Sequence, residues 1–141
     1  MKHWIVLLVV LVLLAVRLAS PSHDNPRETA PLEAPAEVLA VLERACFDCH
    51  SNLTEWPWYS QLPPASWLTG NHVVKGREHL NFSTWGELSA EARRHAMHEI
   101  VAETGQSRMP PGMYLKLHAE AALSDDDLAV IRRWARSPSG R

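Results

Sequence analysis

Two cysteines and a histidine stand in the run Cys46-Phe47-Asp48-Cys49-His50, and they constrain this 141-residue chain more than any other feature. The chain holds no other cysteine. C-x-x-C-H is the attachment pattern of covalent haem, because two thiols about one helical turn apart can add to two vinyl groups on one porphyrin edge. The adjacent histidine then reaches the iron. We therefore predict one haem c, held covalently through Cys46 and Cys49, with His50 as proximal ligand.

Three other uses of the cysteine pair compete with haem attachment. A thioredoxin-like C-x-x-C belongs to a βαβ unit, and this sequence has almost no strand pattern. A structural zinc site needs further ligands, which His95 and His98 could supply, but zinc leaves the adjacent His50 unexplained. A disulfide between residues this close is strained and would be odd as the chain's sole bridge. Haem attachment therefore accounts for the motif best.

The second axial ligand of the iron is sought among methionines and histidines. Met109 follows Gly105, which ends a predicted helix, and it precedes the extended pair Pro110-Pro111. Loops carry ligands more often than helix interiors do. We predict Met109 as the distal ligand, with Met113 as the nearest competitor and His79 as the alternative. The competing interpretation of Met109 is a methionine that fills a gap in the core.

The histidines outside the motif are expected mainly at the surface or in hydrogen bonds. His72 and His79 share one face of a helix predicted over Ser66–Leu80, and either has the chemistry to bind iron. A polar surface role is nevertheless the preferred interpretation for both. The others are placed beside a buried stripe, in a turn or in the N-terminal segment: His95, His98, His118 and His23.

Hydrophobic periodicity predicts an all-α domain. Helices are expected over Ala36–Ala45, Ser66–Leu80 and Glu91–Glu103, with a last helix that begins at a capping box, Ser124–Asp127. The predicted inner faces are Val38, Leu39, Leu42 and Ala45; Ala92, Ala96, Ile100 and Val101; and Leu128, Ile131, Trp134 and Ala135. Four aromatic residues after the motif are candidates to surround a porphyrin or to anchor the core: Trp56, Trp58, Tyr59 and Trp67.

The N-terminus has the pattern of an export signal. Trp4–Val16 carries no charge but is shorter than the roughly 17–25 residues of a spanning helix, which favours a cleaved signal. Cleavage after Ala19 or Ser20 would place Arg17 or Leu18 where a small residue is needed. We therefore predict an uncleaved anchor, formed by residues 4–19 in the bacterial inner membrane, with a cleaved signal as the alternative. Either outcome places the remaining chain in the periplasm.

The sequence predicts that the chain is divided into three segments. Residues 1–20 form the signal-anchor, residues 21–35 a proline-rich tether and residues 36–141 the haem-binding domain, with the domain expected to begin near Leu32. The formal net charge is −2, which does not suggest a surface for nucleic acid.

Several further motifs resemble the haem-binding domain family of bacterial exported proteins. Beyond Cys46–His50 these are Ser51-Asn52, Trp56–Ser60, Ser66–Leu68, Gly76–Ser83 with Trp85, and Met109–Pro111. The resemblance covers about residues 36–136 and implies a small cytochrome c-like helical domain. It implies haem roles for Cys46, Cys49 and His50.

The expected function is one-electron transfer in the periplasm, between membrane and periplasmic redox proteins. No nucleophile–base pair or phosphate loop indicates an independent catalytic site. Two alternatives stay open: a peroxidase or small-ligand sensor with an open distal face, in which His79 is the acid–base group, and a haem-carrying assembly subunit.

Overall fold

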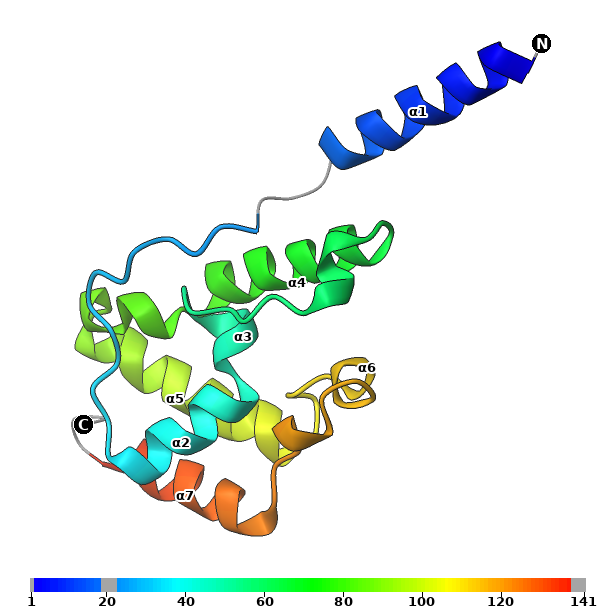
Figure 1. Ribbon diagram of the computed structural model, residues 1–141. Coiled ribbons are helices and arrows are strands. Elements are labelled where there is room, and N and C mark those ends of the chain that lie inside the picture. The colour runs from blue at the N-terminus through cyan, green and yellow to red at the C-terminus, as the bar shows by residue number, and fades with distance from the viewer. Residues whose placement is uncertain (1, 19–22, 138–141) are drawn as a thin grey trace.

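The computed structural model of the chain describes residues 2–18 and 23–137. Regular structure in these residues is helical, and no strand occurs among them (Figure 1). The predicted all-α class is therefore confirmed. The α-helices are α1 (Lys2–Leu18), α2 (Ala36–Ala45), α3 (Phe47–His50), α4 (Ala65–His79), α5 (Ala90–Gly105), α6 (Gly112–Leu115) and α7 (Asp125–Ala135). The 3-10 helices are η1 (Trp58–Gln61), η2 (Phe82–Glu87) and η3 (Ala119–Ala121).

Helix α1 presents apolar side chains to solvent, with Trp4 75% exposed. Among residues 2–18 and 23–137, no helix combines the length and the apolar character that crossing a membrane requires. Residues 19–22, at the junction of the predicted anchor and tether, lie outside the described residues. The side chains of Arg17 and Leu18 are also outside them. The membrane anchor therefore stays a prediction.

The longer helices of the domain begin at local sequence signals. Helix α2 follows Pro35 and occupies the predicted range. Ser89 caps α5 by accepting a hydrogen bond from the backbone N–H of Ala92. At α7, Ser124 and Asp127 form both bonds of the predicted capping box. Such caps satisfy N–H groups that have no partner inside the helix, so they define where the helix starts.

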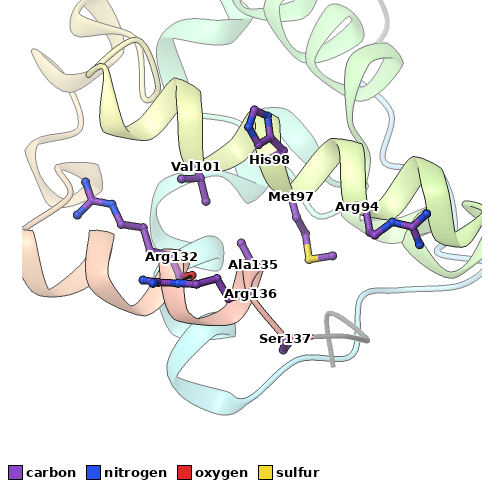
Figure 2. A pocket seen from close by; sticks show the side chains of 8 residues that line it. All are labelled: Arg94, Met97, His98, Val101, Arg132, Ala135, Arg136 and Ser137. Carbon is purple, nitrogen blue, oxygen red and sulfur yellow. Dashed lines mark hydrogen bonds between the residues drawn. The ribbon is translucent and has the colours of Figure 1, made fainter.

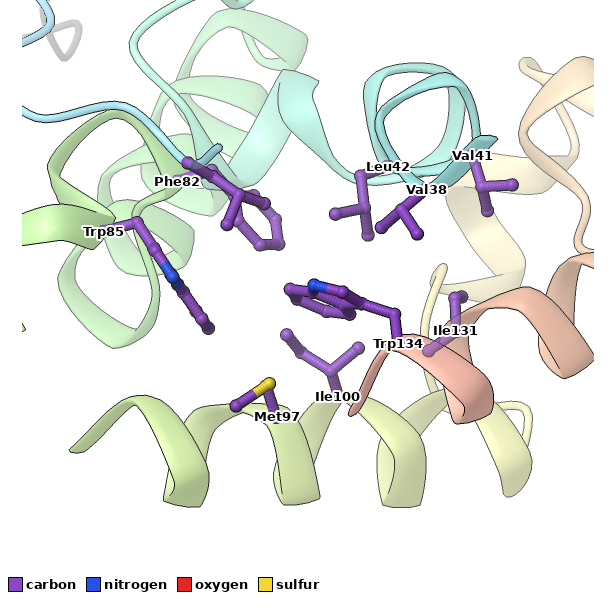
Figure 3. Packing of buried hydrophobic residues seen from close by; sticks show 10 residues of the cluster. Val38, Val41, Leu42, Phe82, Trp85, Met97, Ile100, Ile131 and Trp134 are labelled. Atoms are coloured by element: carbon purple, nitrogen blue, oxygen red, sulfur yellow. The ribbon is translucent and has the colours of Figure 1, made fainter. Parts of the chain in front are cut away.

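A row of aromatic rings joins the cysteine motif to the last helix, and its members Phe82, Trp85 and Trp134 are seen in Figure 3. The ring of Phe47, inside the motif, stacks on Phe82 at 5.3 Å between centroids. Phe82 stacks on Trp85 at 5.9 Å, and Trp85 lies 5.8 Å from Trp134 of α7. Burial of such large rings provides much of the free energy of folding. The cysteine motif is therefore packed directly against the hydrophobic core.

Two of the predicted buried faces need correction. On α2 the buried set is Val38, Val41, Leu42 and Ala45, with Leu39 only partly buried. On α5 the buried residues are Met97, Ile100 and Thr104, whereas Ala92, Ala96 and Val101 are partly exposed. The cause is tertiary, because α2 contacts both α7 and η3, and α5 packs along α7. Met97 is therefore a core residue.

Residues 23–35 of the predicted tether run along the domain (Figure 1), and backbone hydrogen bonds attach them to it. The backbone N–H groups of Thr29 and Ala30 donate to the carbonyl of Ser83, each at 3.2 Å. Leu32 donates to the carbonyl of Phe82 at 2.8 Å, and its side chain is buried. Folded contacts therefore begin before residue 36.

Candidate haem-attachment site

The two thiols lie on one short helical turn. Helix α2 ends at Ala45, Cys46 leaves the helical conformation, and α3 carries Cys49 and His50. The backbone N–H groups of Cys49 and His50 donate to the carbonyl of Cys46 at 3.1 and 2.9 Å. Both cysteines are free rather than joined in a disulfide. These backbone bonds hold Cys46, Cys49 and His50 together in one turn.

Both thiols are held in their protonated form. Burial, assisted by the neighbouring Cys49, raises the pKa of Cys46 to about 12. Burial, assisted by the carboxylate of Asp48, raises the pKa of Cys49 to about 11. Catalytic dithiols of the thioredoxin type instead depend on a lowered thiol pKa. The raised pKa values therefore do not favour thiol–disulfide exchange.

His50 is oriented by the C-terminal end of α4. Its Nδ1 lies 3.0 Å from the carbonyl oxygen of Gly76 and 3.1 Å from that of Leu80. Because a carbonyl only accepts, Nδ1 carries the hydrogen and Nε2 keeps a free lone pair. Burial lowers the pKa of His50, which favours the neutral ring. A neutral imidazole whose other nitrogen is held by a backbone carbonyl is the form that binds metals.

Gly76 permits this close approach of α4 to the cysteine turn. A Cβ atom at this position would lie 2.3 Å from the carbonyl oxygen of Cys49 and 3.0 Å from its carbonyl carbon. Any side chain would therefore separate the two elements. The glycine that opens the Gly76–Ser83 motif is thus required by packing.

Arg77 fastens the N-terminal segment to the residues after the motif. Its guanidinium donates to the carbonyls of Ser51 at 2.7 Å and Asp24 at 2.8 Å. It also donates to Asn25 Oδ1 and Thr54 Oγ1, each at 2.8 Å. With the planar fork occupied in this way, Arg77 is a structural clamp around the attachment turn.

Asn81 and Ser83 of the same motif bond to the segment after His50. The side chain of Asn81 donates to Asn52 Oδ1 at 2.9 Å. Ser83 Oγ accepts from the backbone N–H of Asn52 at 2.9 Å and donates to Glu28 at 2.8 Å. The Gly76–Ser83 motif therefore builds the support of His50. Its partners lie 23 to 55 positions away in the chain, so local sequence spacing does not indicate them.

Two tyrosines and a histidine lie beside the cysteine turn. Tyr114 donates its hydroxyl hydrogen to Asp48 Oδ2 at 2.7 Å, and its ring stacks on His118 at 4.2 Å. His118 Nε2 lies 2.7 Å from the hydroxyl of Tyr59. His118, predicted only as a turn residue, is thus part of an aromatic cluster. Tyr114 was not among the predicted site residues. Its one indication in the sequence is that it follows the Met109–Pro111 motif by three residues.

The structure separates the candidate ligands by exposure. Met97 is buried in the core, but Met109 is 38% exposed and Met113 64% exposed. Met109 follows α5 as predicted, and its backbone N–H donates to the carbonyl of Glu103 at 3.3 Å. His72 and His79 on α4 are both exposed. The core interpretation of Met109 does not hold, because its side chain is not enclosed.

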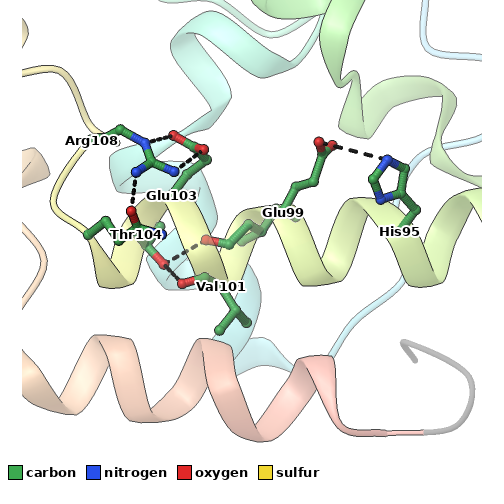
Figure 4. Close-up of polar contacts among 8 residues, drawn as sticks. His95, Glu99, Val101, Glu103, Thr104 and Arg108 are labelled. Carbon is green, nitrogen blue, oxygen red and sulfur yellow. Dashed lines mark hydrogen bonds and ion pairs between the residues drawn. The ribbon is translucent and has the colours of Figure 1, made fainter.

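His95 and His98 do not form a metal site with the cysteines. Both are exposed on α5, and His95 Nε2 lies 3.8 Å from the carboxylate of Glu99, one turn away (Figure 4). Within the described ranges, no three side chains of His, Cys, Asp or Glu are grouped to hold a metal ion. The geometry thus gives no support to the zinc alternative.

Two indoles near the motif keep an unused donor. The Nε1 atoms of Trp56 and Trp67 are buried and have no hydrogen-bond partner among the described residues. His23 packs edge-on against Trp56 at 4.3 Å between centroids, and its Nε2 also has no partner there. Buried donors are nearly always satisfied in folded proteins, so these atoms fit a site that receives an acceptor from a bound group.

A groove of about 580 Å³ lies between α5 and α7 (Figure 2). Apolar side chains and three arginines line it. None of the predicted haem-binding residues lines it. The lining residues are Arg94, Met97, His98, Val101, Arg132, Ala135, Arg136 and Ser137.

The candidate site thus combines two free thiols with a histidine that presents Nε2. The model of the haem-binding domain family matches residues 6–137. The chain belongs to this family, and it is a haem protein.

A curated relative adds a second comparison. The chain is 30% identical over 122 residues to the cytochrome c peroxidase Ccp of Escherichia coli (strain K12). The match covers 79% of this chain but 26% of that protein, so the chain spans about a quarter of its relative's length. No solved structure matches the chain.

Proposed function

We propose that this protein is a monohaem c-type cytochrome that transfers single electrons. The observation that carries the proposal is the arrangement of His50, whose Nδ1 is held by two backbone carbonyls beside a pair of free thiols. Cys46 and Cys49 would hold the porphyrin by adding each S–H across a vinyl group. The bound haem would supply a one-electron couple at its iron.

The position of α4 favours Met109 over His79 as distal ligand. The carbonyls of Gly76 and Leu80 approach His50 from its Nδ1 side, whereas iron would bind at Nε2. His79 lies between these two residues in the chain, on the segment whose carbonyls hold the Nδ1 side of the ring, and its side chain is exposed. Met109 lies on a separate loop, with an exposed thioether. Histidine–methionine ligation raises the reduction potential, which suits electron transfer.

The unpaired indole donors of Trp56 and Trp67 support a haem site near these two tryptophans. A propionate would accept hydrogen bonds from indole N–H groups that otherwise lose their solvation without replacement. The tryptophans would also shield the porphyrin from water, which influences the potential.

The first prediction concerns the distal ligand. In Met109→Ala the ferric and ferrous absorption spectra should change, and the reduction potential should fall by on the order of 0.1 V. His79→Ala should leave both close to wild type, because His79 is exposed and lies on the segment whose carbonyls hold Nδ1 rather than Nε2 of His50. Redox titration followed by absorption measures both effects. The reverse outcome, with His79→Ala altering the iron and Met109→Ala silent, would refute the assignment.

A peroxidase is the second candidate function. It is favoured by the 30% identity with part of a cytochrome c peroxidase. An open distal position would be needed for peroxide to reach the iron. The same spectra decide between the two, because iron with six protein and porphyrin ligands should bind neither carbon monoxide nor peroxide. Rapid peroxide consumption by the wild-type protein would favour the peroxidase.

We also propose that the chain acts at the periplasmic face of the inner membrane, with membrane or periplasmic redox proteins as partners. Exposed apolar side chains along α1 support an anchor. After cell fractionation, the full chain should stay with membranes through a high-salt wash and be released by detergent. Recovery from the soluble periplasmic fraction, with a shortened N-terminus by mass, would instead show a cleaved signal.

A further inference from the structure

The loop that carries Met109 is fastened at both ends. On its N-terminal side, Arg108 makes two bonds to the carboxylate of Glu103, at 2.8 and 2.6 Å (Figure 4). The backbone N–H groups of Arg108 and Met109 both donate to the carbonyl of Glu103, at 2.9 and 3.3 Å. The start of the loop is thus tied to the last turn of α5.

The other end of the loop is attached to the cysteine motif itself. Tyr114 donates its hydroxyl hydrogen to Oδ2 of Asp48, the residue immediately before Cys49, at 2.7 Å. The second oxygen of Asp48 accepts the backbone N–H of Glu55 at 2.9 Å, so the acceptor is itself held in place. Burial, together with the bond to Asp48, raises the pKa of Tyr114, which therefore stays a neutral donor.

The ring of Tyr114 is also held from its other side. His118 stacks on it with an angle of 10° between the ring planes. The two nitrogens of His118 contact the hydroxyl of Tyr59 at 2.7 Å and Glu120 at 3.1 Å. These contacts limit the directions in which the Tyr114 hydroxyl can point.

We propose that Tyr114 is a positioning residue, whose hydrogen bond to Asp48 holds the Met109 loop beside the attachment turn and so keeps Met109 on the iron. This inference rests on the proposed ligation by Met109. A hydrogen bond to a charged acceptor is strong enough to shift such a loop equilibrium about tenfold. In the chain, only the residues Pro110 to Met113 lie between Met109 and Tyr114, so this bond acts close to the proposed ligand.

Binding of added imidazole to the ferric holoprotein tests the proposal. Imidazole must displace Met109, so its affinity reports how often the loop leaves the iron. In Tyr114→Phe the affinity should rise about tenfold, with faster hydrogen–deuterium exchange in the loop. In Asp48→Ala it should also rise, and adding Tyr114→Phe to that variant should cause little further increase, because one bond joins the two residues.

Tyr59→Phe is the matched control. It removes a hydroxyl from the same cluster but leaves the Asp48–Tyr114 bond, the stacking of His118 on Tyr114 and the contact of His118 with Glu120, so the imidazole affinity should change by less than about twofold. If Met109→Ala raises the affinity and Tyr114→Phe does not, the positioning role is refuted while the ligation stands. If Met109→Ala has no effect on the affinity, the ligation and the positioning role both fail.

Discussion

Replacement of Gly76 by alanine should destabilise the domain and loosen His50. The new Cβ would lie 2.3 Å from the carbonyl oxygen of Cys49, a backbone atom that cannot rotate away. Such overpacking costs about 3 kcal/mol, at the upper end of its usual range, and alanine's better helix propensity offsets about 1 kcal/mol. We therefore expect a net loss of about 2 kcal/mol in the free energy of unfolding, measured by denaturant titration of the holoprotein.

The absorption spectrum of the iron tests whether the Gly76→Ala substitution also disturbs His50. If α4 moves away from the cysteine turn, the carbonyl of Gly76 moves away from His50 Nδ1, and the iron spectrum should change as well. Gly112→Ala is the control, because a Cβ at Gly112 meets no atom within 4 Å, and its effect should stay within about 0.5 kcal/mol. Wild-type stability and spectrum in Gly76→Ala would show that this close contact is unnecessary.

Loss of the cysteines should abolish covalent haem. In the double variant Cys46→Ser and Cys49→Ser no thiol is left to form a thioether, and the chain has no other cysteine. We expect the haem that stays with the polypeptide after denaturing extraction to fall by at least about tenfold, as measured by haem absorbance per protein. Stability should fall too, because a cofactor that binds the folded state alone stabilises that state.

His95→Ala combined with His98→Ala is the control for this experiment. These histidines are exposed on α5 and were the additional ligands that a zinc site would need. Their removal should leave covalent haem unchanged. Covalent haem in the double cysteine variant would contradict the c-type assignment. Zinc that is bound by the wild-type protein and lost in the double histidine variant would instead support the zinc interpretation.

Most of the helices could be predicted from local patterns. The ranges expected from periodicity differ from α4 and α5 by one or two residues at each end, and the range of α2 is the same. The capping box at Ser124 also follows from residues that are neighbours in the chain. Helix periodicity and caps depend on side chains a few residues apart, so a linear pattern contains them.

The buried faces were less predictable. Val41 and Met97 are in the core because α7 lies against both α2 and α5, and no local pattern states where α7 will lie. A periodic helix can rotate toward either of two neighbours at little cost in propensity. Tertiary packing therefore decides which flank of the apolar stripe is enclosed.

The sequence by itself determined the chemistry of the site: two thiols and a histidine at the spacing of haem attachment, with Met109 as a candidate on a loop. The tertiary structure alone decided how these residues are supported. The contact of Gly76 with Cys49, the carbonyls behind His50 and the bond from Tyr114 to Asp48 join residues 26 to 66 positions apart. Bonds over such separations depend on how whole helices pack, which short-range sequence spacing does not specify.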